Sequence, residues 1–337
     1  MKPTIRDVAK LAGVSISTVS RVMNTPESVV ASKREKVQQA IEQLQYQPNG
    51  LARGLIYRKT NSLGVIIPDI QNPYYAGVIR GMEDAAKTLG YSLMICNTDH
   101  DKHRLFSYFE SLNEKRADGI LFASEVVYPD YYQEMRCYRT PIVLVSTHSL
   151  EYELPSVKIN DEAAAYDAVS YLISQGHRSI GMISFGLTDP IAGLPRLQGF
   201  QRALREHGLE ASGKQVIYAQ HWHDEAYDAA AQLLRQFPGI TAIFTASDEF
   251  AMGVLSYLHD HHIACPGQIS VMGFDNIRMA QMTIPKLSTV AQPAYRIGYR
   301  SVEKLDGLIR GEPASNLREY LPHEIIVRQS TGSAPIG

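Results

Sequence analysis

Cysteine is scarce in this chain of 337 residues: there are three, Cys96, Cys137 and Cys265, and no two form a CxxC pair. This scattered, odd-numbered set argues against a disulfide scaffold and lacks the spacing of a zinc or redox site. We therefore expect small apolar core residues in a reducing compartment.

The chain also lacks any run of eighteen or more apolar residues, and Lys2, Arg6, Asp7 and Lys10 stand where a signal peptide would need an apolar segment. We expect a cytoplasmic protein without membrane association. A hydrophobic content of 45% is ample for buried cores, and the length predicts two or three folding units.

The signatures of common enzyme classes are missing. No GxGxxG follows a predicted strand and no GxSxG is present, while residues 181–188 (GMISFGLT) have Leu187 where a phosphate-binding loop requires lysine. The HDHH run at 259–262 lacks the spacing of a known metal site. We expect no enzymatic activity, no cofactor and no metal.

Charge is unevenly distributed. Residues 1–60 hold ten Lys or Arg against four Asp or Glu, a net +6, whereas the remainder holds 23 against 31, a net −8. A basic first segment joined to an acidic body is typical of a polyanion-binding module attached to a different kind of domain.

The segment from Thr4 to Asn24 reads as two short helices joined by a glycine turn. Thr4 and Asp7 form a capping pair, Gly13 suits the tight turn, and Ser15 can cap the second helix. Such a pair reads DNA in the major groove or, alternatively, is an ordinary part of a small bundle. The second helix would expose Ile16, Ser17, Thr18, Ser20 and Arg21.

Ser32 and Glu35 predict a capped third helix that runs to Leu44, which completes a bundle. Pro48 follows, and residues 49–55 (NGLARGL) are compatible with a helix too short to be stable alone. This segment must therefore fold against something else.

From Ser62 onward, apolar strands alternate with amphipathic helices, which predicts parallel sheets covered on both faces and more strands than one small sheet holds. The predicted strands are 63–68, 92–97, 119–123, 142–145, 179–183, 215–218, 242–245, 269–273 and 287–291; the predicted helices include 74–89, 163–175, 197–207, 225–237 and 249–262.

Polar residues follow several of these strands, where α/β folds bind ligands. Amides, carboxylates and aromatic rings together suit a small polyhydroxylated ligand, although each polar residue alone reads equally well as a cap or turn residue. Trp222 is either a lid or a core residue. The candidates are Asn72, Tyr74, His148, Arg196, Trp222, Ser247, Asp275 and Gln292.

Several motifs together resemble the lactose/galactose repressor family along nearly the full chain. They are DVAKLAGVSISTVSRVMN, REKVQQAIEQLQYQPNGLARGL, GVIIPDIQNPYYAGVIRGME, ASDEFAMGVL, ISVMGFDN and LSTVAQP. The resemblance implies an all-α helix-turn-helix headpiece (1–47), a hinge helix and linker (48–60), and a periplasmic-binding-protein-like α/β body (61–337) of two Rossmann-like subdomains. Their expected bounds are about 61–160 with 293–322, and about 161–292 with 323–331.

The resemblance also implies residue roles. Ile16, Ser17 and Arg21 would read bases, and Leu55, flanked by Asn49 and Arg53, would wedge into the minor groove. Phosphates would be held by Thr4, Ser15, Thr18, Ser20 and Asn24. The effector would contact Asn72, Tyr74, Arg196, Ser247, Asp275 and Gln292, and also His148 and Trp222.

Departures from the family pattern matter. Ser146, Thr147 and His148 replace the Asp-Arg pair of ribose-type members, which indicates a ligand other than ribose. The catabolite-control branch, which meets a phosphoserine-bearing carrier protein, is resembled at Tyr295, but the same helix carries Glu303 and Asp306, which would repel a phosphate.

We therefore expect a sequence-specific DNA-binding transcriptional regulator, a repressor of carbohydrate-metabolism genes, controlled allosterically by a small sugar-like effector. A last strand at 327–331 (VRQST), followed by no leucine heptads, predicts a homodimer on pseudo-palindromic double-stranded operator DNA. The alternatives are a catabolite-control-type regulator with a phosphoprotein corepressor and a sugar-binding protein without a DNA role.

Overall fold

The computed structural model describes residues 3–46, 59–187, 189–210, 214–219, 223–313 and 316–335. The chain divides into two compact units, Met1–Thr60 and Asn61–Gly337. The predicted residues Asn49, Arg53, Leu55 and Trp222 lie outside the described residues, as does the side chain of Asn24.

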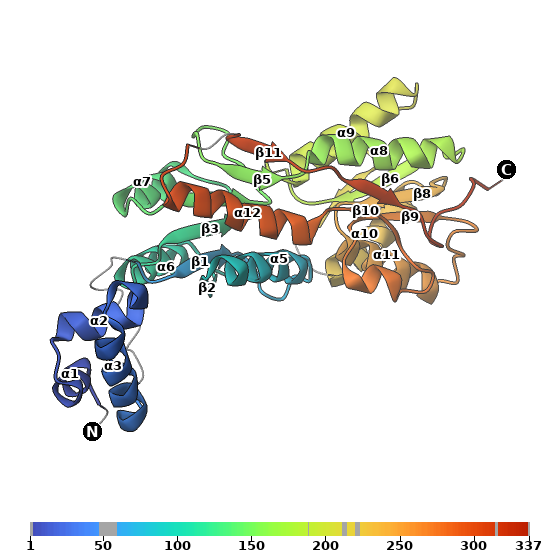
Figure 1. Ribbon diagram of the computed structural model, residues 1–337. Helices are drawn as coiled ribbons and strands as arrows, with labels where there is room; N and C mark the ends of the chain where they lie inside the picture. The colour runs from blue at the N-terminus through green and yellow to red at the C-terminus, as the bar shows by residue number, and fades with distance from the viewer. Residues whose placement is uncertain are drawn as a thin grey trace. The chain divides into compact units, whose positions relative to one another are not determined.

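The first unit is a small helical bundle. It contains α1 (Ile5–Ala12), α2 (Ile16–Asn24), a 3-10 turn η1 (Pro26–Ser28) and α3 (Ala31–Leu44) (Figure 1). Val8, Val19 and Val37, one from each helix, are fully buried in one apolar cluster. The helices thus share a core that none could form alone.

The turn between α1 and α2 has the predicted chemistry. Gly13 is left-handed with φ 64°, and the Ser15 hydroxyl accepts a hydrogen bond from the Thr18 N–H at 3.2 Å. At the start of α1, the Asp7 carboxylate accepts from the Thr4 N–H at 2.9 Å. Glycine and side-chain caps therefore fix the angle at which α2 leaves α1.

The capping box predicted at Ser32 and Glu35 is wrong. The Val30 carbonyl accepts hydrogen bonds from the Lys33 and Arg34 N–H groups, at 3.0 and 3.1 Å, so Val30 is the N-cap of α3. Ser32 consequently lies inside the first turn, where it cannot cap the helix.

The second unit holds two six-stranded sheets, in the orders β11-β5-β4-β3-β1-β2 and β12-β10-β9-β8-β6-β7. Every pairing between the described strands is parallel except that of β10 with β12. The first sheet has β1 (Ser62–Ile67), β2 (Ser92–Asn97), β3 (Gly119–Ala123), β4 (Ile142–Val145), β5 (Ser156–Lys158) and β11 (Arg318–Tyr320); the second has β6 (Ile180–Ser184), β7 (Val216–Tyr218), β8 (Ala242–Thr245), β9 (Ser270–Asp275), β10 (Ser288–Ala291) and β12 (Glu324–Ile326).

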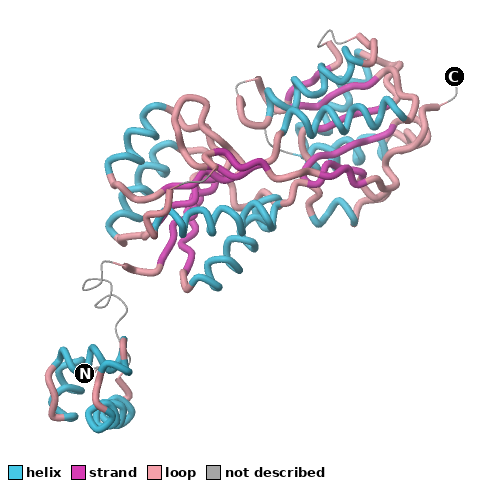
Figure 2. Tube along the Cα trace, turned by 45° about the horizontal axis from the view of Figure 1, so that its top comes forward, coloured by secondary structure: helices cyan, strands magenta, loops and turns pink. Residues whose placement is uncertain are grey.

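Helices cover both faces of each sheet, as Figure 2 shows. Along β1, Leu63 and Val65 join the core under α5 and α12, whereas Ile66 joins the core under α6 and α7, because successive strand residues point to opposite faces. The covering helices are α5 (Tyr74–Leu89), α6 (Lys102–Glu114), α7 (Pro129–Cys137) and α12 (Ala294–Ile309) on the first sheet, and α8 (Asp161–Ser174), α9 (Gly193–Glu206), α10 (His223–Gln236) and α11 (Asp248–Asp260) on the second.

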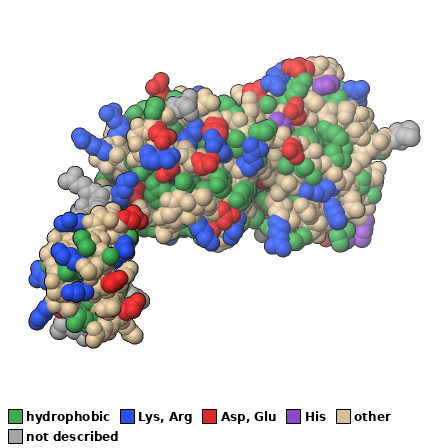
Figure 3. All heavy atoms as spheres, in the orientation of Figure 1, with side chains coloured by type: hydrophobic (Ala, Val, Ile, Leu, Met, Phe, Trp, Pro, Cys, Tyr) green, Lys and Arg blue, Asp and Glu red, His purple; other side chains and the backbone are tan. Residues whose placement is uncertain are grey.

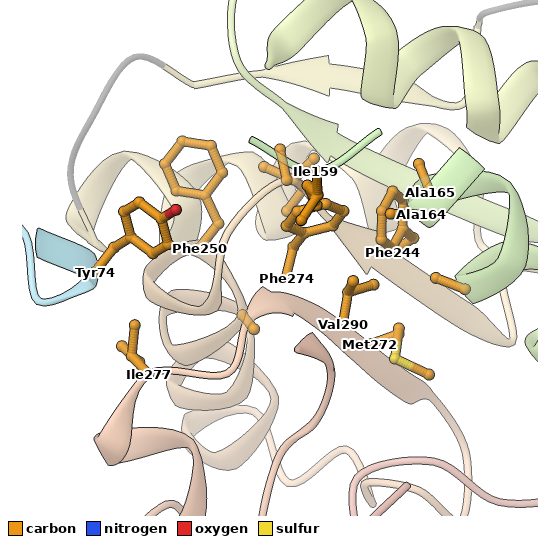
Figure 4. Packing of buried hydrophobic residues seen from close by; sticks show 14 of the residues in the cluster. Tyr74, Ile159, Ala164, Ala165, Phe244, Phe250, Met272, Phe274, Ile277 and Val290 are labelled. Carbon is orange, nitrogen blue, oxygen red and sulfur yellow. The ribbon is translucent and has the colours of Figure 1, made fainter. Parts of the chain in front are cut away.

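The core of the second sheet is rich in aromatic residues. Phe244 and Phe274, from neighbouring strands, have ring centroids 6.4 Å apart, and Figure 4 shows Phe244 beside Ala164 and Ala165 of α8 and Phe274 beside Ile159. The small side chains let the helix approach the rings closely.

No helix in the described part of the chain is long and apolar enough to cross a bilayer.

Three connections join the two sheets: β5 to α8, β10 to α12, and β11 to β12.

The short strands β5, β11 and β12 were not predicted, nor were α6 and α7. The strand expected at 327–331 is wrong, because pairing with β10 ends at Ile326. The other predicted strands are confirmed with ends shifted by at most two residues.

The packing of α5 against α12 depends on two glycines. A Cβ on Gly298 would lie 1.9 Å from the Val78 carbonyl oxygen, and one on Gly81 would lie 1.9 Å from the Tyr295 carbonyl oxygen. Neither contact can be relieved by rotating a side chain, since both neighbours are backbone atoms. The two helices therefore touch along their main chains.

We predict that Gly298→Ala lowers the free energy of unfolding by about 1–3 kcal/mol, because the helices must separate to admit the methyl group. Urea unfolding followed by circular dichroism measures this. Gly239→Ala is the control, since a Cβ there meets nothing within 4 Å, and it should change the free energy by less than about 1 kcal/mol. Equal effects would contradict the packing argument.

Candidate functional site

The outer face of α2 carries the residues predicted to meet DNA. Ile16 is 44% exposed, Ser17 and Arg21 are exposed, and Thr18 and Ser20 are half-buried. Lys and Arg side chains are plentiful on the visible face of this unit (Figure 3). An exposed apolar side chain beside hydroxyls and a cation can contact both base edges and phosphates.

The hydroxyl groups predicted to hold phosphates are bonded within the protein. The Ser15 hydroxyl lies 2.8 Å from that of Ser17 and 2.9 Å from that of Thr18, and at the start of α1 the Thr4 hydroxyl donates to the Asp7 carboxylate at 2.7 Å. These contacts restrict the side-chain rotamers before any partner binds, which lowers the entropy cost of binding.

A cleft of about 1010 Å³ lies between the two sheets of the second unit. Its lining residues follow the carboxyl ends of strands from both sheets, where ligands bind in folds of this kind. Of the predicted residues, the lining includes Asn72, Tyr74, Arg196, Ser247, Asp275 and Gln292.

A buried ion group forms one wall of the cleft. The Asp161 carboxylate lies 2.8 Å from Nη2 of Arg196 and 2.9 Å from Nζ of Lys158, and all three residues are at most 6% exposed. Burial acts to raise the pKa of Asp161, but the two neighbouring cations outweigh it and hold the pKa below its ordinary value. Asp161 is therefore ionised and paired.

Arg196 is held on several sides. Its Nε donates to Asp161 at 2.9 Å, its Nη1 donates to the Ala246 carbonyl at 2.5 Å, and its guanidinium lies 3.7 Å from the ring centroid of Phe274. The side chain is thus fixed in the cleft wall before a ligand arrives.

A chain of hydrogen bonds crosses the cleft. Gln292 Nε2 donates to Asp275 at 2.7 Å, and the Tyr74 hydroxyl donates to Gln292 Oε1 at 3.3 Å and lies 2.8 Å from the Ser146 hydroxyl. Tyr74 begins α5, which covers the first sheet, and Ser146 follows β4 of that sheet, whereas Asp275 ends β9 of the second. The chain therefore links the two halves of the body.

Burial raises the pKa of Asp275 to about 6, although Arg196, with Nη1 at 4.0 Å, and Gln292 favour the ionised form. On the opposite wall, burial raises the pKa of Glu125 to about 7. Both carboxyl groups can therefore change protonation near neutral pH.

Two predicted lining residues also cap helices. Asn72 Oδ1 accepts from the Tyr74 N–H at 2.9 Å near the start of α5, and the Ser247 hydroxyl accepts from the Phe250 N–H at 3.2 Å at the start of α11. Cap and lining roles thus coincide in these side chains.

His148 does not line the cleft. Burial, together with the nearby charges of Lys158 and Arg318, lowers its pKa to about 4, and its Nδ1 has no hydrogen-bond partner among the described residues. The chain turns at Ser146, which has φ 55°, and Thr147 bonds to the Glu125 carbonyl at 3.0 Å, so His148 follows the turn away from the lining.

Among the charged lining residues that sequence reasoning missed are Glu125, Lys158, Asp161 and Asp189. Lys158 and Asp161 flank the end of β5, whose three residues are too few to show alternation. Asp189 was missed although its carboxylate accepts from the N–H groups of Ile191, Ala192 and Gly193, at 2.8 to 3.1 Å. An aspartate shortly before a helix was the available signal.

Comparison with known proteins identifies this architecture. A model described as bacterial regulatory proteins, lacI family, matches residues 4–49, and one described as periplasmic binding proteins and sugar binding domain of LacI family matches residues 60–322. The chain belongs to the LacI family. It is a DNA-binding transcriptional regulator with a helix-turn-helix headpiece and a periplasmic-binding-protein-like body.

Individual relatives span the whole length. Catabolite control protein A of Priestia megaterium is 38% identical over 331 residues, covering 98% of this chain and 100% of the relative. The solved structure of a transcriptional regulator CelR–cellobiose complex is 28% identical, covers 97% of this chain and 99% of that one, and has a TM-score of 0.75. These relatives are transcription regulators rather than enzymes.

The lac repressor dimer bound to operator and the anti-inducer ONPF covers 99% of this chain and 100% of its own with a TM-score of 0.90. Its sequence identity of 24% makes this a likeness of fold alone. The LacI-family fold predicted from the sequence motifs is thereby confirmed.

We predict that Asp161→Asn lowers the free energy of unfolding by about 3–5 kcal/mol, because Lys158 and Arg196 would remain buried without the carboxylate that pairs with both of them. Denaturant unfolding measures this. Asp84→Asn is the matched control, since Asp84 pairs with Arg80, whose side chain is 68% exposed, and it should cost no more than about 1 kcal/mol. Similar losses in both variants would refute the buried-ion argument.

Proposed function

We propose that this LacI-family regulator represses carbohydrate-metabolism genes as a homodimer on pseudo-palindromic operator DNA, and that a sugar-like effector in the cleft sets its DNA affinity. The carrying observation is the hydrogen-bond chain of Tyr74, Gln292 and Asp275, which crosses a cleft lined by polar and aromatic residues. The names of relatives support this proposal: one is a catabolite control protein and another a complex with cellobiose.

Ligand hydroxyls would compete for the groups that now bond across the cleft. A sugar that donates to Asp275 and accepts from Tyr74 would replace protein–protein hydrogen bonds by bonds through itself, which favours one angle between the two sheets. DNA favours one angle as well, so effector and DNA change each other's affinity by the same factor.

We propose that residues 1–47 bind operator DNA, 48–60 act as a hinge and 61–337 bind effector and dimerise. In the headpiece, Ile16, Ser17 and Arg21 contact base edges, while Thr4, Ser15, Thr18, Ser20 and Asn24 hold phosphates. The roles of Asn49, Arg53 and Leu55 remain predictions for residues outside those described.

An exposed apolar strip supports dimerisation through the body. Met279, Met282 and Ile284, in and after η2 (Arg278–Gln281), are 36%, 61% and 94% exposed. Adjacent exposed apolar side chains mark interaction surfaces, and two-fold operators call for two-fold proteins.

The alternative, a phosphoprotein corepressor, is favoured by the identity to a catabolite control protein A. The surface of α12 argues against it. Arg300 pairs with Glu303 at 2.7 Å and Glu319 at 2.9 Å, and Arg310 pairs with Asp306 at 2.9 Å. A phosphoserine would have to displace these carboxylates, so we favour a sugar effector.

We predict that Arg21→Ala weakens operator binding about 10- to 100-fold, because one charged contact to a base or phosphate is lost. Fluorescence anisotropy with a site selected from random duplex DNA measures this. Arg205→Ala removes an exposed cation from α9 of the body and should leave affinity unchanged. Unaltered binding by the Arg21 variant would rule out the proposed contact.

We predict that effector affinity falls about tenfold between pH 7 and pH 5, because the ionised Asp275 is the stronger hydroxyl acceptor and its pKa is about 6. Isothermal titration calorimetry at several pH values tests this. Asp275→Asn should bind more weakly at pH 7 and lose most of the pH dependence. A wild-type affinity that is flat from pH 7 to pH 5 would contradict the assignment.

A further inference from the structure

The charges that line the cleft are strongly unbalanced. The lining contains two basic residues, Lys158 and Arg196, apart from His100. Against them stand the carboxyl groups of Asp69, Asp99, Glu125, Asp161, Asp189, Glu249 and Asp275.

Both cations are already engaged by the protein. Lys158 Nζ lies 2.9 Å from Asp161 and donates to the Ile191 carbonyl at 3.2 Å. Arg196 uses Nε and Nη2 on the same Asp161 and Nη1 on Ala246. An anionic ligand would therefore have to compete with the buried Asp161 carboxylate for each cation. Displacing that carboxylate is costly, because it would leave a buried charge unpaired.

The helix N-termini at the cleft are also occupied. In α/β folds such ends commonly hold phosphate, because their N–H groups and dipole favour negative charge. Here Asp189 accepts from three N–H groups at the start of α9, Ser247 caps α11, and Asn72 bonds to the Tyr74 N–H at α5. The protein thus fills the positions that a phosphate would use.

Uncharged hydroxyl groups do not need to displace the carboxylates that pair with the cations or cap the helices. The same carboxylates accept hydrogen bonds from hydroxyls, and the rings of Tyr74, Tyr75 and Phe185 offer apolar faces to sugar C–H groups. Tyr74 and Tyr75 pack edge to face with centroids 5.6 Å apart, so that two ring orientations line the same wall.

We propose that the effector is a saccharide without an anionic group, either neutral or amino-bearing, and that the cleft rejects phosphorylated and carboxylated sugars. This inference rests on the proposed function, because it specifies the ligand class of the effector cleft. A neutral sugar and its phosphate share most of their hydroxyl groups, so hydrogen bonds to hydroxyls distinguish them poorly. Repulsion by the lining carboxylates is what excludes the phosphate.

The test uses the full-length protein and a panel of neutral mono- and disaccharides, amino sugars, sugar phosphates and sugar acids. Thermal shift finds the ligands, and calorimetry then compares each one with its phosphorylated or oxidised counterpart. We expect binding by at least one neutral or amino sugar, and at least about tenfold weaker binding by its anionic counterpart. An anionic sugar that binds more tightly than its parent would overturn the inference and leave the sugar-effector function intact.

Absence of binding by every class would instead reject the sugar-effector function, and the inference with it. Asp189→Asn supplies a second measurement, because the amide keeps a cap oxygen for α9 and removes one negative charge. In this variant, the ratio of the dissociation constant of the phosphorylated sugar to that of the neutral sugar should fall several-fold. Asp130→Asn, a carboxylate outside the cleft lining, should leave the ratio unchanged. Equal ratios in both variants would show that lining charge does not select the ligand.

Discussion

The buried ion group of Lys158, Asp161 and Arg196 is the constraint on which the body of this regulator depends. Lys158 ends β5 of the first sheet, Asp161 begins α8, and Arg196 belongs to α9 beside the second sheet. Buried charges are tolerable only when they are paired, and here one carboxylate serves two cations, so this group fixes where the chain leaves one sheet and enters the other. The same three residues therefore form part of the cleft wall and hold the first connection between the sheets.

Three side chains that line the cleft are held by helix ends. Asn72, Asp189 and Ser247 each accept a backbone N–H near the start of a helix, which fixes their rotamers. A cap needs an acceptor oxygen and leaves further hydrogen-bonding capacity on carboxylates, amides and hydroxyls. These side chains therefore cap a helix and line the cleft at the same time, so a capping role does not argue against the proposed contact with a ligand.

Periodicity and strand-end polarity predicted much of this molecule. Strands such as β2 and β8 were placed correctly, and polar residues predicted to follow strands, including Ser247 after β8 and Gln292 after β10, do line one cleft. The features that the sequence did not predict are short strands and contacts between residues far apart in the chain. Strands of three residues carry no alternation, and the pairing of Asp161 with Arg196 joins residues 35 positions apart. His148 is not among the residues that line the cleft; it follows a left-handed turn at Ser146, which spacing does not reveal.

The proposed coupling between the cleft and DNA needs a part of the protein that both ligands can move. Two of the three connections between the sheets carry cleft residues: Asp161 follows β5, and Gln292 follows β10. Gln292 bonds strongly within its own half, at 2.7 Å to Asp275, but only at 3.3 Å to Tyr74 across the cleft. A long neutral hydrogen bond contributes little net free energy, so the two sheets are held together weakly at this point. A ligand that makes even two good hydrogen bonds to both walls therefore outweighs it and can set the angle between the sheets.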